Sequence, residues 1–293
     1  MVQVRVRHSL AASEREQVMV FLEAARRRDG SQLNDQLTSD LTHGRREGFM
    51  AAIAFLPDGS VHGYAQASAA NDGFIIGSVA SPDDTPTQSA VLRALLAALP
   101  PDIAVTWWAR GDESALAYEL GLSPGRRLLR MGRRLPLSET TDVVVRPFRI
   151  GDDEPAWLAV NNAAFAWHGE QGGWGITTIR QRENEPWFDP NGFLLHERAG
   201  RLAGFCWTKL HDHEGQLIGE IYVIAVHPDF HGHGLGRALT VAGLQHLQSV
   251  GATAAMLYVD EENTAAVGLY GALGFSIENT DHSYQRPARG ATP

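Results

Sequence analysis

The chain has little of several features that would otherwise define its class. It has one cysteine, Cys206, among 293 residues, which excludes an internal disulfide and favours a reducing compartment. No apolar run approaches the roughly 20 residues of a membrane span, and the first residues lack the apolar core of a secretory signal. Acidic residues outnumber basic ones by 34 to 25, which argues against a nucleic-acid-binding face. We therefore expect a cytoplasmic protein without nucleic-acid or membrane partners. We also expect a monomer, although composition does not determine the oligomeric state.

Lysine is the scarcest charged residue. Lys209 is the only lysine among the 25 basic residues, and the others are arginine. A GC-rich genome explains the arginine background. Against that background, a single lysine suggests a position where a compact ammonium is required and a planar guanidinium would not fit. Lys209 is therefore a candidate functional residue, with an incidental surface charge as the alternative.

The two halves of the chain show the same order of predicted elements. In the first half we predict helices at 13–28, 88–99 and 113–120, and strands at 2–8, 50–56, 63–69, 74–80, 103–109 and 128–134. In the second half we predict helices at 154–165, 235–250 and 264–273, and strands at 143–146, 192–197, 202–209, 220–226, 254–259 and 276–284. The length suits two domains, and the matching order indicates a duplication. We predict domains at 1–137 and 138–293, with 136–142 as the linker.

The clearest local motif lies between the strand at 220–226 and the helix at 235–250. It reads His-Pro-Asp-Phe-His-Gly-His-Gly-Leu-Gly-Arg over 227–237. Glycines allow backbone N–H groups to converge on one anion, and the helix N-terminus adds its positive dipole end. The turn therefore predicts a pyrophosphate site, although a tight strand-to-helix turn needs glycine for its own geometry.

A second motif, Asn-Thr-Ala-Ala-Val-Gly-Leu-Tyr-Gly-Ala-Leu-Gly-Phe, occupies 263–275. The two motifs at this spacing resemble the GNAT acetyltransferases, and the resemblance covers the C-terminal half. It implies acetyl-CoA as co-substrate and an α/β fold of two tandem GNAT domains, each a twisted mixed β-sheet flanked by helices. Histidines 231 and 233 stand where the family often has a basic or amide side chain, and neutral histidine weakens the positive field.

The GNAT resemblance also implies which residues contact the coenzyme. The pantetheine arm would pair with the backbone of Ile224, Ala225 and Val226. The pyrophosphate would be held by His231, Gly232, His233, Gly234, Leu235, Gly236 and Arg237. The other side of the coenzyme would be lined by Asn263, Thr264, Ala265, Ala266, Val267 and Gly268.

The corresponding segment of the first half differs. It has no glycine over 79–89 and carries Asp83 and Asp84, which would repel a pyrophosphate. Aligning the glycines that end the short helices, Gly121 and Gly274, places Ala117 opposite Tyr270. We therefore predict that the first domain has a degenerate coenzyme site and no catalytic activity.

Five further segments indicate a particular group within the GNAT enzymes. They lie at 161–165, 170–174, 187–190, 205–209 and 219–223. In order they read Asn-Asn-Ala-Ala-Phe, Glu-Gln-Gly-Gly-Trp, Trp-Phe-Asp-Pro, Phe-Cys-Trp-Thr-Lys and Gly-Glu-Ile-Tyr-Val. Together they resemble the mycothiol synthases, tandem GNAT enzymes of actinobacteria. That resemblance implies acetylation of the cysteinyl amine of cysteinyl-glucosaminyl-inositol, giving mycothiol and CoA. The resemblance is weak in the first half of the chain, where Asp35 belongs to the best local match.

The chemistry of amine acetylation suggests roles for these residues. An α-amino group titrates near ~8 rather than the ~10.4 of lysine, so Glu220, acting through water, is a sufficient general base. Tyr270 would protonate or stabilise the departing thiolate. Trp174 and Trp207 could stack on sugar faces. Hydroxyl recognition suits carboxylates and an ammonium, and the candidate acceptor-binding residues are Asp35, Glu170, Lys209, Glu220 and Tyr258.

Each of these residues also has a structural explanation. Glu220 would cap a strand end and Tyr270 would pack a helix, whereas Glu170 and Lys209 would be surface charges. Asp35 would be a helix N-cap, and the tryptophans would belong to the core.

Other functions are open on the same fold. The acceptor could be another small amine or a protein N-terminus, or the chain could be a coenzyme-sensing scaffold without turnover. The histidine pairs at 211 and 213 and at 231 and 233 lack the helical spacing and carboxylate partner of a metal site, so we expect no metal.

Overall fold

The chain folds into two compact units that are not successive halves of the sequence. Unit 1 combines Met1–Arg127 with Thr280–Pro293, and unit 2 is Leu128–Asn279. The computed structural model describes residues 2–43, 48–70, 73–81, 83–166, 171–213 and 215–288. Within these residues no helix is both long enough and apolar enough to cross a membrane.

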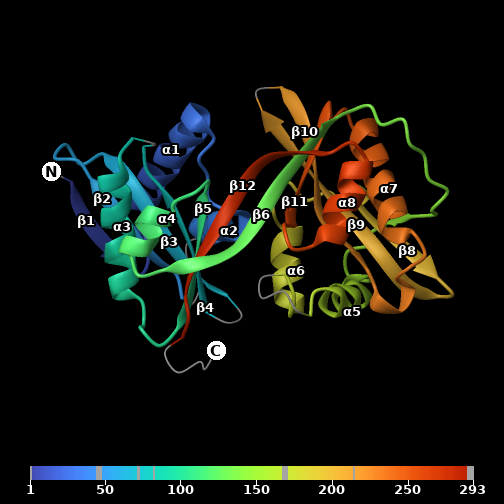
Figure 1. Ribbon diagram of the computed structural model, residues 1–293, viewed down its shortest axis with the longest axis horizontal. Helices are drawn as coiled ribbons and strands as arrows, with labels where there is room; N and C mark the ends of the chain where they lie inside the picture. The colour runs from blue at the N-terminus through green and yellow to red at the C-terminus, as the bar shows by residue number, and fades with distance from the viewer. Residues whose placement is uncertain are drawn as a thin grey trace. The chain divides into compact units, whose positions relative to one another are not determined.

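Unit 1 is a mixed β-sheet with helices on both faces (Figure 1). Its strands, in order across the sheet, are β1 (Gln3–Arg7), β2 (Met50–Phe55), β3 (Val61–Ala70), β4 (Gly73–Val79), β5 (Ala104–Arg110) and β12 (Ser276–Arg286). Neighbours are antiparallel except β4 and β5, which are parallel. Its helices are α1 (Ala12–Asp29), α2 (Asp35–His43), α3 (Thr85–Ala98) and α4 (Ser114–Glu119).

Alternation along β2 places a hydrophobic core on each face of this sheet. Ala52 and Ala54 pack in the core that α3 and α4 cover. Ala51 and Ile53 pack in the core that α1 and α2 cover. Because both faces are covered, β2 is buried along its whole length and reads as a continuous apolar run.

Unit 2 repeats this architecture. Its strands, in order, are β6 (Ser123–Arg134), β11 (Ala254–Asp260), β10 (Gln216–Val226), β9 (Arg201–His213), β8 (Phe193–Arg198) and β7 (Arg146–Pro147). Only β10 and β11 are parallel among the described strand pairs of this unit. Its helices are α5 (Glu154–Ala164), α6 (Ile176–Glu183), α7 (Leu235–Ser249) and α8 (Thr264–Ala272), with short 3₁₀ helices η1 (Pro190–Gly192) and η2 (Pro228–Phe230).

The two faces of the unit 2 sheet differ in chemistry. One face packs against α7 and α8 through aliphatic side chains such as Ile221 and Leu239. The helix α7 lies close to the sheet, because a Cβ at Gly243 would overlap the Cys206 sulfur. The other face packs against α5 and α6 through aromatic rings such as Trp157 and Trp207. Lys209, Glu220 and Tyr258, three of the candidate acceptor residues, lie on this aromatic face.

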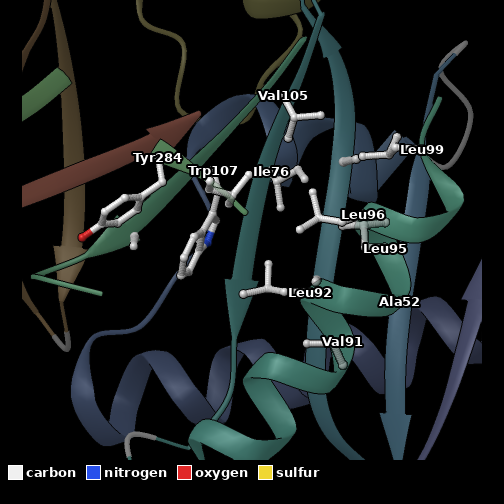
Figure 2. Packing of buried hydrophobic residues seen from close by; sticks show 14 of the residues in the cluster. Ala52, Ile76, Val91, Leu92, Leu95, Leu96, Leu99, Val105, Trp107 and Tyr284 are labelled. Carbon is white, nitrogen blue, oxygen red and sulfur yellow. The ribbon is translucent and has the colours of Figure 1, made fainter. Parts of the chain in front are cut away.

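Each unit is completed by the last strand of the other half of the sequence. Residues 128–134 of β6 pair with β11 in unit 2. Residues 281–286 of β12 pair with β5 in unit 1. Figure 2 shows the consequence, since the Tyr284 ring of β12 lies beside Trp107 in the core of unit 1, with ring centroids 5.4 Å apart. The boundary at 137/138 stays a prediction about the sequence repeats, because the compact units exchange strands around it.

The predicted elements match the observed ones closely along most of the chain. Two helices were not predicted, α2 and α6. Their sequences, Asp-Gln-Leu-Thr-Ser-Asp-Leu-Thr-His and Ile-Thr-Thr-Ile-Arg-Gln-Arg-Glu, contain only two apolar residues each, too few to show a helical periodicity. The strand predicted at 143–146 is reduced to Arg146–Pro147 in β7.

Candidate functional site

The strand β10 separates from its neighbour β11 beyond a β-bulge. The bulge falls at Tyr222, between the pairs Ile221↔Thr208 and Val223↔Trp207. On the other side, the pairing with β11 runs from Ile218↔Ala254 to Ile221↔Leu257, whereas β10 continues to Val226 and β11 to Asp260. A bulge bends a strand and increases its twist. In the described chain, residues 222–226 therefore have no strand partner on the β11 side.

This open backbone edge contains Ile224, Ala225 and Val226, the residues predicted to pair with the pantetheine arm. An extended ligand with amide groups can add to such an edge as a strand does. In unit 1 the opening is shorter, because β4 ends at Val79, two residues after its last pair with β5, Gly77↔Trp108. The described pairing of β3 with β4 has no register shift either. The structure therefore provides an extended edge in unit 2 but not in unit 1.

The turn before α7 presents a run of backbone donors. Gly232 and Gly234 have φ values of 79° and 71°, in the left-handed region that favours glycine. The first backbone bond of the helix is donated by Ala238 to Gly234. Among the described residues, no acceptor is bound by the amides of 232–237. These donors and the helix dipole make the turn suited to a pyrophosphate.

The corresponding helix of unit 1, α3, has a carboxylate at its N-terminus. The Asp84 carboxylate accepts the Thr87 backbone N–H at 3.0 Å through Oδ1, and its Oδ2 atom lies 2.9 Å from His62 Nε2. A carboxylate already occupies the place where an anion would bind. This arrangement supports the prediction of a degenerate coenzyme site in the first domain.

The side chains of the unit 2 turn have unequal roles. The His231 Nε2 atom lies 2.9 Å from the Val226 carbonyl oxygen, so the ring donates this bond and links the two ends of the turn. His233 and Arg237 are exposed. His231 can therefore support the turn, while Arg237 supplies its permanent positive charge.

The predicted second coenzyme segment begins with a helix cap. The Asn263 side chain accepts the Ala266 backbone N–H at 3.2 Å and so caps α8. Thr264, Ala265 and Gly268 are exposed, whereas Ala266 and Val267 are half-buried. This segment presents small residues at the surface, where a ligand can approach closely.

Tyr270 lies on α8, on the aliphatic face of the sheet. It is 8% exposed and packs against Phe275 with ring centroids 5.9 Å apart. Burial raises the pKa of the Tyr270 phenol well above its ordinary value. The phenol is therefore protonated at neutral pH, which is the state that a proton donor requires.

Glu220 lies on the aromatic face, one residue before the pairing of β10 with β11 ends. It pairs with Lys209 of β9 and with Met256 of β11. Its side chain is 9% exposed, and its Oε2 atom lies 2.6 Å from His211 Nε2. Glu220 and Tyr270 thus approach the separated strands from opposite faces of the sheet.

Lys209 is buried among aromatic rings rather than exposed. Its Nζ atom lies 4.5 Å from the centre of the Trp187 ring and 5.5 Å from that of Tyr222. Both distances are within the range of cation–π attraction. A compact ammonium suits this position, which rules out the surface-charge explanation of Lys209.

Of the other predicted acceptor residues that the structure describes, only Tyr258 is placed on the face of Glu220. Tyr258 is 37% exposed and lies on β11 beyond the last pair with β10. It shares the face of Glu220, because its neighbours Leu257 and Val259 belong to the aliphatic core. Asp35 begins α2 in unit 1, where Asn34 and not Asp35 provides the N-cap to Leu37. Glu170 lies outside the described residues. Asp35 and Glu170 therefore stay predictions.

The interpretation of Trp207 as a sugar platform is wrong. Trp207 is fully buried and stacks on Phe193 with ring centroids 4.3 Å apart. No ring face is left for a ligand. Trp174 is half-buried, with its ring 5.7 Å from Trp157.

His211 is the contact that sequence reasoning missed. Its spacing from His213 suggests only a possible metal ligand, whereas alternation along β9 places it on the face of Lys209. Within the described ranges, no three His, Cys, Asp or Glu side chains are grouped as metal ligands. His211 instead contacts Glu220, the predicted base.

Comparisons with known proteins agree with this geometry. Residues 161–275 match the acetyltransferase (GNAT) family. The mycothiol acetyltransferase of Thermomonospora curvata is 44% identical over 285 residues, covering 92% of this chain and 93% of the relative. That of Thermobispora bispora is 42% identical, covering 97% of this chain and 99% of the relative. That of Streptomyces coelicolor is 39% identical, covering 94% and 93%.

Solved structures show the same fold at low sequence identity. A GCN5-related N-acetyltransferase from Sphaerobacter thermophilus has a TM-score of 0.69 at 18% identity, covering 99% of this chain and 97% of that one. A tandem GNAT protein from the clavulanic acid biosynthesis pathway has a TM-score of 0.68 at 15% identity, covering 99% and 100%. The predicted tandem GNAT fold is confirmed. The chain belongs to the mycothiol acetyltransferase family of GNAT enzymes.

Proposed function

We propose that this chain transfers the acetyl group of acetyl-CoA to the cysteinyl amine of cysteinyl-glucosaminyl-inositol, giving mycothiol and CoA. One structural observation carries the proposal. A shielded carboxylate, Glu220, lies where β10 separates from β11, on the same face as the buried ammonium of Lys209. Relatives of 39–44% identity over most of the chain carry the name of this activity.

Acetyl-CoA would bind to unit 2 mainly through the backbone. Residues 224–226 would pair with the pantetheine arm, and the unpaired amides of 232–237 would bind the pyrophosphate. These groups depend on strand and turn geometry rather than on side-chain charge. This explains how two histidines can be present in the turn without loss of binding.

The acetyl transfer needs a base and an acid at opposite sides of the thioester. Glu220 takes a proton from the acceptor ammonium, whose pKa is near ~8 and needs no stronger base. The amine nitrogen then bonds to the acetyl carbon and gives up its second proton to solvent, and the carbon–sulfur bond breaks. Tyr270, held protonated by burial, gives its proton to the leaving sulfur. The backbone N–H groups beside Ile224 would stabilise the oxyanion.

The sugar and inositol would be recognised on the aromatic face. Lys209 donates and Tyr258 both donates and accepts, which suits a polyhydroxylated acceptor. Asp35 and Glu170 would accept from further hydroxyls. We propose that the enzyme works as a monomer in the cytoplasm, where acetyl-CoA is available and its single cysteine stays reduced.

A thiol-release assay tests the proposal. Turnover of the cysteinyl conjugate should exceed that of simple amines and of peptides with free N-termini. Glu220→Gln should lower kcat by about 10²–10⁴-fold, while calorimetry shows unchanged acetyl-CoA affinity. Equal turnover of simple amines would contradict the proposed acceptor, and full turnover by Glu220→Gln would contradict the base.

A further inference from the structure

His211 and Glu220 are diagonal neighbours on adjacent strands. In the antiparallel register, His211 of β9 is opposite Ile218, and Lys209 is opposite Glu220. Side chains two residues apart on a strand point to the same face, and long side chains bridge the diagonal between strands. The His211 Nε2 atom lies 2.6 Å from Glu220 Oε2.

The chemistry of the pair defines the direction of this bond. An ionised carboxylate only accepts hydrogen bonds, so the imidazole must donate through Nε2–H. The bond is short, as charge-assisted bonds are. The Glu220 side chain is 9% exposed and that of His211 is 23% exposed. The bond is therefore largely shielded from water, which strengthens it.

The two oxygens of Glu220 have different surroundings. Oε2 is bound to His211, whereas Oε1 has no hydrogen-bond partner in the part of the chain that the structure describes. Oε1 is also not among the fully enclosed polar atoms that have no partner. A carboxylate tethered by one oxygen cannot rotate freely, so the other oxygen keeps one direction.

We propose that His211 is a positioning residue for the proposed base. By donating Nε2–H to Glu220 Oε2, it holds the carboxylate so that Oε1 receives the proton of the acceptor amine. The proposal rests on the proposed function, in which Glu220 is that base. His211 neither takes the proton nor touches the acetyl group, so its effect passes entirely through Glu220.

A double-mutant cycle tests this dependence. His211→Phe should lower kcat by about 10- to 100-fold, the loss expected for a hydrogen bond to a charged group. The KM for acetyl-CoA should stay unchanged, because the coenzyme contacts lie in other segments. His211→Gln should recover much of the rate, since its amide N–H can replace Nε2–H. In the Glu220→Gln background, His211→Phe should cost nothing further.

A matched histidine provides the control. His196 of β8 lies in the same unit, and its Nδ1 atom is 2.8 Å from the Val144 carbonyl oxygen. His196→Phe should leave kcat unchanged. Unchanged kcat in His211→Phe would overturn the proposal while leaving the acetyltransferase function intact. An equal loss with and without Glu220→Gln would also overturn it, because His211 would then act independently.

Nuclear magnetic resonance of ¹⁵N-histidine-labelled protein gives a readout that needs no turnover. At pH 8 the His211 ring should be protonated on Nε2, and its signal should move in Glu220→Gln. A ring with a bare Nε2 would refute the positioning bond even if the wild type acetylates the conjugate. Failure of the wild type to acetylate the conjugate, with the Nε2–H bond present, would instead contradict the proposed function.

Discussion

Two buried tyrosines show how the same side chain can serve different purposes in the two units. Tyr270 packs in unit 2 on the face opposite Glu220, and its hydroxyl is bound to no described residue. Tyr284 packs in unit 1, where its hydroxyl accepts the Glu113 N–H at 2.9 Å and donates to Asp112 at 3.1 Å. The first hydroxyl is available to a ligand and the second is used by the fold.

We expect Tyr270→Phe to lower kcat by about 100-fold, because the leaving thiolate loses its proton donor. Acetyl-CoA affinity should change little, since the ring and its packing remain. Steady-state thiol release and calorimetry would measure the two effects. Tyr284→Phe is the control and should cost about 1 kcal/mol of stability without changing kcat. Wild-type turnover by Tyr270→Phe would remove Tyr270 from the reaction.

A pair of glutamates between α5 and α6 predicts a pH dependence of stability. Glu154 Oε2 and Glu183 Oε1 are buried without a donor among the described residues. Burial first, and then the charge of Glu154, raise the pKa of Glu183. A raised folded-state pKa favours folding below the ordinary glutamate value of 4.5, and this contribution is lost as the pH rises through the folded-state pKa.

Glu183→Gln should therefore become more stable than the wild type as the pH rises above 4.5. Urea unfolding of both proteins across pH 4 to 8 would measure the difference. Glu23→Gln is a control of opposite sign, because the Arg26 guanidinium lowers the pKa of Glu23 to about 2. A pH-independent difference for Glu183→Gln would contradict the assignment.

At the scale of single elements, the helices α3 and α7 differ at their N-termini rather than in their packing. Asp84 caps α3 with a carboxylate, whereas Gly234 precedes α7 and offers no side chain. The strand before α7 also bends at its bulge and leaves its neighbour. These two local differences support the proposal that unit 2 binds the coenzyme and unit 1 does not.

Gly234 allows a matched test of the turn. Gly234 and Gly200 both have positive φ, 71° and 72°, and a Cβ at either would meet no atom within 4 Å. Gly234→Glu and Gly200→Glu should therefore cost a similar ~1–2 kcal/mol of stability. Only Gly234→Glu should abolish acetyl-CoA binding by calorimetry, because its carboxylate opposes the pyrophosphate. Unchanged affinity would refute the role of the turn.

At the scale of the whole molecule, strand exchange makes the two sequence halves depend on each other. A fragment 1–137 would lack β12 and therefore Tyr284 in its core. A fragment 138–293 would lack β6 and leave the β11 edge unpaired. Unpaired edges and missing core rings are both strongly destabilising.

We expect neither of these halves to unfold cooperatively alone, as measured by thermal circular dichroism. The fragment 128–279 matches unit 2 and carries the residues that pair with β11. It should fold and bind acetyl-CoA. A cooperative transition in isolated 138–293, equal to that of 128–279, would show that β6 is dispensable.

Much of the architecture could be read from the sequence because it depends on local patterns. Strands buried on both faces appear as apolar runs, and α7 shows helical periodicity between two glycines. The glycine turn and the Asn263 segment depend on backbone conformation and capping, which short motifs encode directly. The helices α2 and α6 were missed because each has only two apolar residues, so the face that each buries leaves no periodic pattern in the sequence.

By itself, the sequence determined the order of most elements, the duplication, the glycine turn before α7 and the position of Glu220 on a central strand. Tertiary structure alone decided the exchange of β6 and β12, the opening between β10 and β11, and the contact of His211 with Glu220. The physical reason is the separation along the chain of the residues that interact. Periodicity and turn chemistry act between residues close in the chain, whereas strand partners and side-chain pairs depend on register between distant segments.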